Sequence, residues 1–177
     1  MKLGLFALPA VFLLAVATVF VGCGSSDSLT LEEYFEQFEA IDADADAKIE
    51  ALYADFPADG DDPTNDANLP FFQELFTGFP GVVGDLVDGL KDLDPPAEVE
   101  DAHNDLIEAG EDLVVALGEN ADAFNGAETT SELMALNDVA EESIQPAVAR
   151  FDSACLAVVD IAEASGIAND ISCEDDE

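Results

Sequence analysis

The single histidine of the chain, His103, is the side chain best suited to acid–base chemistry or metal binding. Glu100 precedes it by three positions, which places a carboxylate and the imidazole on one face of a helix. Di-iron four-helix proteins need two such Glu-x-x-His units, and one histidine allows only one. The same count excludes a zinc pair of two histidines. Two interpretations remain: a mixed site of His103 with carboxylates from facing helices, or, more simply, a core histidine bonded to a carboxylate, Tyr34 or Tyr53.

Clustered aspartates are the second group that suggests chemistry, namely the binding of a divalent cation. Residues 42–46 read Asp-Ala-Asp-Ala-Asp, like the start of an EF-hand calcium loop. That loop needs glycine at its sixth position and glutamate at its twelfth, and here Ala47 and Tyr53 stand there. A looser cluster lies in the Pro- and Gly-containing loop 57–68, where oxygen ligands would suit Ca²⁺. Its acids are Asp59, Asp61, Asp62 and Asp66.

No other catalytic pattern is present in the sequence. There is no glycine-rich phosphate loop followed by lysine, no Cys-x-x-Cys-His haem motif and no serine in a nucleophile elbow. Paired carboxylates discriminate nothing in a chain with 41 acidic residues. We therefore predict a non-enzymatic protein with no catalytic residue, no cofactor and no metal-ligand set.

The charge of the chain is strongly negative, with 41 acidic and four basic residues and a net charge of −37. Such a chain lacks the basic patches that nucleic acid or anionic lipid headgroups require. Self-repulsion opposes compactness, so salt or divalent cations should stabilise the fold. The acidity indicates either a solvated coat, which we favour, or the binding of cations or of a cationic partner.

The N-terminal segment has the pattern of a secretory signal. Lys2 is followed by an apolar stretch that ends in Phe20-Val21-Gly22-Cys23. This stretch resembles a bacterial lipoprotein signal, although Phe20 stands where that family usually has leucine. The resemblance implies cleavage after residues 1–22 and a diacylglyceryl group on the sulfur of Cys23. The alternative is an uncleaved transmembrane helix, for which about 20 apolar residues suffice.

The lipoprotein interpretation sets the expected location and organisation. Residues 23–30 would be the lipidated cysteine and a flexible tether, and the protein would lie on the extracytoplasmic face of the cell membrane, held by its lipid. Once Cys23 carries lipid, Cys155 and Cys173 remain as a pair in an oxidising compartment, which predicts a disulfide. A reactive thiol is less favoured, because no basic neighbour would lower its pKa.

Helical periodicity dominates the rest of the chain and predicts an all-α, antiparallel up-down bundle of about four helices over residues 31–166. An acidic tail, 167–177, follows. Capping boxes are expected at Thr30 with Glu33 and at Thr129 with Glu132. Prolines predict further features of the helices. Around Pro80 we expect two short helices or one broken helix, and at Pro146 a kink. The third helix should have Pro95 as its N-cap and Pro96 as its first helical residue. Gly166 should end the last helix.

Four phenylalanines, Phe71, Phe72, Phe76 and Phe79, precede Pro80. The simplest interpretation is that these side chains belong to the hydrophobic core. The alternative is a slot or docking surface for an apolar ligand or partner, since exposed apolar clusters mark interaction sites.

Residues 90–98, Leu-Lys-Asp-Leu-Asp-Pro-Pro-Ala-Glu, together with His103, resemble a segment of small exported helical bacterial proteins. That resemblance implies an extracytoplasmic helical domain and carries no activity. The sequence thus predicts a lipid-anchored helical protein with a binding or structural role. The alternatives are a divalent-cation-binding lipoprotein and a carrier or docking module that uses the Phe71–Phe79 region.

Overall fold

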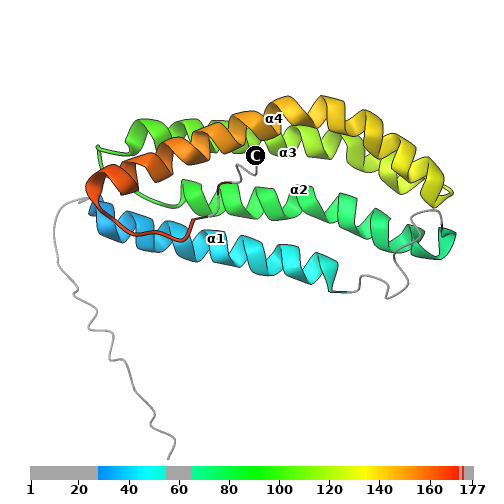
Figure 1. Ribbon diagram of the computed structural model, residues 1–177, viewed down its shortest axis with the longest axis horizontal. Coiled ribbons are helices and arrows are strands. Elements are labelled where there is room, and N and C mark those ends of the chain that lie inside the picture. The colour runs from blue at the N-terminus through cyan, green and yellow to red at the C-terminus, as the bar shows by residue number, and fades with distance from the viewer. Residues whose placement is uncertain (1–27, 55–64, 172, 174–177) are drawn as a thin grey trace, which may run out of the picture.

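The computed structural model describes residues 28–54, 65–171 and Cys173. It contains four α-helices and one short 3-10 turn: α1 (Leu31–Tyr53), η1 (Asp66–Asn68), α2 (Leu69–Lys91), α3 (Glu100–Gly126) and α4 (Thr130–Ser165). Successive helices run in opposite directions and pack on one another, α1 on α2, α2 on α3 and α3 on α4 (Figure 1). The predicted all-α up-down bundle is confirmed. Residues 1–22 and Cys23 lie outside the described part.

The start of α1 is fixed by the predicted capping box. The Thr30 hydroxyl accepts the Glu33 N–H at 3.3 Å, and the Glu33 carboxylate accepts the Thr30 N–H at 3.0 Å. Two backbone donors that have no partner within the helix are thereby satisfied. The apolar stripe that follows buries Tyr34, Phe35 and Phe38.

Helix α2 runs through Pro80 without interruption, so the predicted break at this residue is wrong. Proline removes one backbone hydrogen bond, but the helix is held on both sides of it. Leu75 lies before the proline and Val82 after it, and both are buried. Packing of α2 against α1 and α3 therefore outweighs the lost bond.

The third helix begins later than predicted. Its N-cap is Val99 and its first residue is Glu100, so Pro96 is not its first helical residue. The Pro96 carbonyl instead accepts the Val99 N–H at 3.0 Å in a preceding turn. This turn places Val99, which is fully buried, in the core, and that burial explains the shifted start.

Helix α4 begins and ends as predicted and is continuous through Pro146. Thr129 accepts the Glu132 N–H at 3.1 Å, but the Glu132 carboxylate accepts the N–H of Glu128 instead of completing the predicted box. Gly166 ends the helix with a left-handed φ of 73°, which favours glycine. Pro146 is exposed, and Figure 1 shows α4 arched over α3.

The C-terminal tail turns back from Gly166 and crosses to α1 (Figure 1). The Asp170 N–H donates to the Glu39 carboxylate at 3.0 Å. Ile171 is buried in the same cluster as Tyr34, Phe35 and Phe38 of α1. The tail thus covers one end of the seam between α1 and α4.

A second core cluster lies at the opposite end, around Phe124, Ala127, Leu133 and Ala140. All residues of both clusters lie between Leu29 and Cys173. A chain that begins at Gly24 therefore contains every core contact described and should fold without residues 1–23. We call it the soluble chain.

Helix α1 stops short of the second cluster. A Cβ atom placed on Gly78 of α2 would lie 2.7 Å from Leu52, so these two residues stand at the same level. Leu52 is next to the end of α1 at Tyr53, whereas α2 begins at Leu69, about 13 Å further along the bundle. In the described part of the chain, α2, α3 and α4 therefore form the bundle at this end of α2 without α1 (Figure 1).

Candidate functional site

His103 is a buried core residue rather than part of an open site. It is 2% exposed, and its Nδ1 lies 3.0 Å from the hydroxyl of Tyr34 on α1. Burial lowers the pKa of His103 and raises the pKa of Tyr34, so both side chains are neutral at pH 7. Of the two interpretations drawn from the sequence, the structure supports the core histidine bonded to Tyr34. Glu100 is exposed.

Within residues 28–54, 65–171 and Cys173, no group of three or more His, Cys, Asp or Glu side chains is arranged to hold a metal ion. Asp66 of the predicted acidic loop has a structural contact, because its carboxylate accepts the Thr130 N–H at 2.9 Å at the start of α4. The other acids of that loop, Asp59, Asp61 and Asp62, lie outside the described residues.

Cys155 and Cys173 form the predicted disulfide, with their Cα atoms 5.7 Å apart. Cys155 lies in the buried stretch of α4, and Cys173 lies in the tail just after Ile171. The bond therefore ties the tail to α4 beside α1. The sequence predicts the pairing but does not show that the tail crosses the α1–α4 seam.

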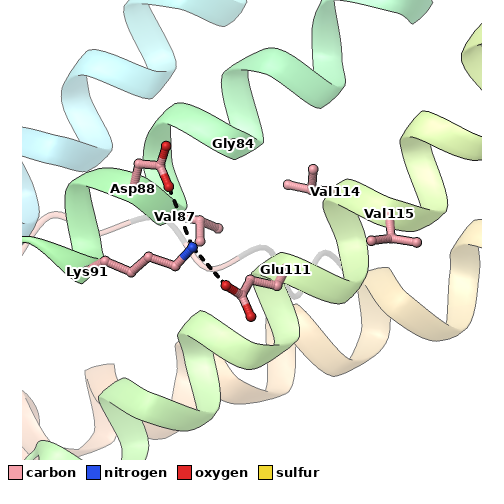
Figure 2. Close-up of a pocket in the computed structure, with 7 residues that line it drawn as sticks. All are labelled: Gly84, Val87, Asp88, Lys91, Glu111, Val114 and Val115. Carbon is pink, nitrogen blue, oxygen red and sulfur yellow. Dashed lines mark ion pairs between the residues drawn. The ribbon is translucent and has the colours of Figure 1, made fainter.

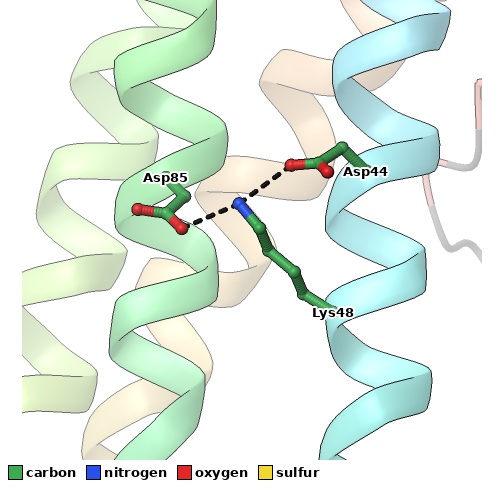
Figure 3. Close-up of polar contacts among 3 residues, drawn as sticks. All are labelled: Asp44, Lys48 and Asp85. Carbon is green, nitrogen blue, oxygen red and sulfur yellow. Dashed lines mark hydrogen bonds and ion pairs between the residues drawn. The ribbon is translucent and has the colours of Figure 1, made fainter.

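Three basic residues, one on each of α1, α2 and α4, each bridge two helices. Lys48 lies 2.8 Å from Asp44 on its own helix and 2.7 Å from Asp85 on α2 (Figure 3). Lys91 pairs with Asp88 on its own helix and with Glu111 on α3. Arg150 of α4 pairs with two carboxylates of α3, Glu108 and Asp112. The seams α1–α2, α2–α3 and α3–α4 thus each hold one cation between carboxylates, and the hydrogen bonds raise the pKa of all three cations.

A shallow groove lies on the α2–α3 seam and is shown in Figure 2; we call it the α2–α3 groove. Its lining residues are Gly84, Val87, Asp88, Lys91, Glu111, Val114 and Val115. Lys91 closes one end by pairing with Glu111 at 2.7 Å and with Asp88 at 3.5 Å (Figure 2). The ammonium group of Lys91 is already paired, so it is not available to a ligand. The rim residue Val115 is 60% exposed, so this groove would enclose a ligand only slightly.

The predicted phenylalanine cluster is only half-buried, and its last member lines a groove. Phe71, Phe72, Phe76 and Phe79 are all of intermediate exposure. Phe76 and Phe79 line a small pocket against Phe124 and Ile144, of about 230 Å³. Phe79 also lines a groove of about 400 Å³ between α1, α2 and α4, which we call the Phe79 groove.

The Phe79 groove is apolar along its floor and acidic along one rim. Its lining residues are Asp42, Ala45, Asp46, Ile49, Tyr53, Phe79, Val82, Val83, Leu86 and Phe151. The rings of Tyr53 and Phe79 meet edge to face with centroids 6.3 Å apart. The groove is thus a concave apolar surface with a few polar groups at its edge, the usual composition of a ligand site.

The order and length of the elements explain why the Phe79 groove, on the seam between α1 and α4, is not covered by another described element. The tail and Ile171 cover the α1–α4 seam at the end where α1 begins, and α1 itself ends at Tyr53. Between these two points no third element lies across the groove in the described part of the chain. The sequence indicates the role of Phe79, but the contributions of Ala45 and Phe151 depend on a juxtaposition of α1 and α4 that periodicity does not reveal.

Comparisons with protein-family models, with curated proteins and with solved structures find no match to this chain. None of the helices in the described ranges is both long and apolar enough to cross a membrane.

Proposed function

We propose that this chain is a lipid-anchored protein of the extracytoplasmic membrane face that binds an apolar ligand in the Phe79 groove and catalyses no reaction. The observation that carries the binding role is the groove itself. It has about 400 Å³ and is lined mainly by aliphatic and aromatic side chains. Sites for small molecules typically span about 300–1,000 Å³ and have such linings.

The anchor is supported by the sequence pattern that ends at Cys23. Helix α1 begins at Leu31, eight positions later, so the tether spans at most about 27 Å. Ile49 and Tyr53 lie about 27–33 Å along α1 from its start. The groove therefore lies toward the end of α1 opposite the one that the tether joins.

Binding is tested by isothermal titration calorimetry of the soluble chain with naphthalenemethanol, an uncharged probe. The wild type should show saturable binding. Val83→Phe places a ring in the Phe79 groove and should abolish it, because Val83 is half-buried in the groove lining. Val115→Phe places the same ring on the α2–α3 groove and should change nothing. Absence of saturable binding to the wild type, or equal binding to Val83→Phe, would contradict the proposal.

The anchor is tested by mass spectrometry of the full-length protein isolated from membranes of the cells that produce it. The mature chain should begin at Cys23 and carry the mass of a diacylglyceryl group. Cys23→Ser should retain residues 1–22 and lose the lipid mass. A wild-type protein with residues 1–22 still attached would support the transmembrane alternative instead.

A further inference from the structure

We propose that the ligand of the Phe79 groove is a hydrophobic organic cation, a molecule with an apolar body and one quaternary or protonated amine. The inference rests on the proposed function, since it names the ligand class for the same groove. It is carried by three features of the described lining residues: an apolar floor, an aromatic end and an acidic rim in which none of them is basic.

The apolar floor of the groove favours a ligand with an apolar body. Val82 and Ala45 are buried beneath the groove, and Ile49, Val83, Leu86 and Phe151 are partly exposed toward it. Covering these side chains with a ligand removes apolar surface from water, which lowers the free energy of the complex. An ion without an apolar body would leave this surface wet and gain none of that free energy.

The aromatic end provides a place for the positive charge. Tyr53 is 46% exposed, and its ring stands at 75° to that of Phe79. The face of an aromatic ring carries negative electrostatic potential and attracts a cation within about 6 Å. Two rings set at an angle form the corner of an aromatic cage, the arrangement by which proteins recognise quaternary ammonium groups.

The acidic rim of the groove also favours a ligand with a positive charge. Asp42 and Asp46 lie one helical turn apart on α1 and both line the groove. None of the described lining residues is basic. The nearest lysine on α1, Lys48, places its Nζ between Asp44 and Asp85 on the α1–α2 seam. A cationic ligand would therefore meet two carboxylates, and no basic side chain, among the described residues that line the groove.

The acidic rim continues toward the tail. Asp42 and Asp46 also belong to a row of carboxylates with Glu36, Glu39 and Asp170, which line one hollow between α1 and the tail. With 41 acidic and four basic residues in the chain, the long-range field concentrates cations at the surface and repels anions. The charge of the whole molecule thus favours the ligand class that the groove favours locally.

The test compares three probes with the same naphthyl body: naphthylmethyl trimethylammonium, naphthalenemethanol and naphthylacetate. Each is titrated into the soluble chain at 20 mM NaCl by isothermal titration calorimetry. The cation should bind about tenfold more tightly than the alcohol, and the carboxylate more weakly than either. The preference for the cation should narrow at 500 mM NaCl, because the rim carboxylates are exposed to screening.

Two variants assign this preference to the groove. Asp42→Asn with Asp46→Asn should weaken cation binding about fivefold and leave the alcohol within about twofold. Asp122→Asn with Asp138→Asn removes the same charge from exposed positions that line neither the Phe79 groove nor the α2–α3 groove, and should leave the preference unchanged. Tyr53→Leu keeps an apolar side chain at a half-exposed position, so it should fold and lose part of the preference.

The outcomes separate the inference from the function beneath it. Equal affinity for the cation and the alcohol, with Val83→Phe abolishing both, would overturn the cation inference and leave the apolar binding site intact. If the variant of Asp42 with Asp46 and the variant of Asp122 with Asp138 reduce the preference for the cation equally, the preference comes from the acidic surface in general. That result would also overturn the inference. No saturable binding of any probe would overturn both proposals. If the Asp42 and Asp46 variant does not fold, Tyr53→Leu decides in its place.

Discussion

At the scale of single residues, the only histidine of the chain serves packing. His103 would be the natural general base of an enzyme, yet it is 2% exposed and faces the Tyr34 hydroxyl at 3.0 Å. The count of histidines in the sequence correctly excludes di-iron and two-histidine zinc sites, and Tyr34 is among its predicted partners. Which partner is used depends on the register of α1 against α3. That register is set by the packing of side chains and not by the spacing of residues along either helix.

The buried imidazole makes stability depend on pH in a defined direction. The pKa of His103 in the folded chain is lowered by burial from its ordinary value of 6.5. As pH falls below 6.5, the unfolded chain therefore binds a proton that the folded chain resists, and the free energy of unfolding decreases. His103→Gln keeps a hydrogen-bonding side chain near Tyr34 but does not titrate.

Urea unfolding at pH 7.5 and 5.5 measures this effect. Between the two pH values the wild type should lose stability relative to His103→Gln. Carboxylates contribute equally to both chains, so the difference isolates the histidine. An unchanged difference would show that His103 is protonated as easily in the folded chain as in the unfolded chain, and a difference of opposite sign would show that it is protonated more easily in the folded chain.

At the scale of elements, the amphipathic patterns predict four helices, the Thr30 cap and the Gly166 end, because these depend on neighbouring residues. Two predictions fail at prolines, Pro80 and Pro96, where tertiary packing overrides the local preference of proline. A third, the capping box of Thr129 with Glu132, forms only in part, because the Glu132 carboxylate accepts the Glu128 N–H. The Phe79 groove is predictable only in part, since Phe79 is conspicuous in the sequence and the rest of the lining is assembled by packing. The path of the tail is likewise invisible without the fold.

Close contact between the central helices depends on one glycine. A Cβ atom on Gly110 of α3 would lie 2.5 Å from Val87 of α2 and 3.3 Å from Phe151 of α4. Gly110→Ala should therefore lower the free energy of unfolding by about 1–3 kcal/mol through overpacking.

Gly118→Ala is the matched control on the same helix, because a Cβ there meets no other atom within 4 Å. It should raise stability by about 0.5–1 kcal/mol through helix propensity alone. Urea unfolding measures both variants. Equal and favourable effects would show that α3 has room at Gly110 and that the contact with α2 and α4 is looser than described.

The tail acts as a strap across the α1–α4 seam, and its disulfide should contribute to stability. Cys155→Ala with Cys173→Ala opens a loop with a sequence separation of 18. The chain-entropy model assigns a loop of this size about 3 kcal/mol. Hydrogen exchange at the Asp170 amide, which donates to Glu39, should accelerate in the variant. Retained protection and unchanged stability would show that Ile171 holds the tail without help from the disulfide.

At the scale of the whole molecule, the fold holds a net charge of −37 with four basic residues. The three in the described helices lie on three different helix–helix seams, each paired with two carboxylates. Figure 2 shows the pairs of Lys91, and Figure 3 shows those of Lys48. These pairs reduce the repulsion between carboxylates of neighbouring helices. Composition predicts this net repulsion but not the placement of the cations, which requires the register between helices.

Removing one bridging cation should expose this repulsion. Lys48→Met leaves Asp44 and Asp85 facing each other across the α1–α2 seam, so the thermal midpoint should fall. The loss should be larger at 20 mM than at 500 mM NaCl, because salt screens exposed charges. Lys48→Arg retains the charge and should behave as the wild type. A salt-independent loss would assign the role of Lys48 to its aliphatic stem instead.

The central claim, that the Phe79 groove is the binding site of this protein, is tested most directly by an amide NMR titration of the soluble chain with naphthylmethyl trimethylammonium. We predict saturable shift changes centred on Ala45, Ile49, Phe79 and Val83, with the amides around Val115 unmoved. Shifts centred on the α2–α3 groove, or small shifts spread evenly over the acidic surface without saturation, would contradict the account.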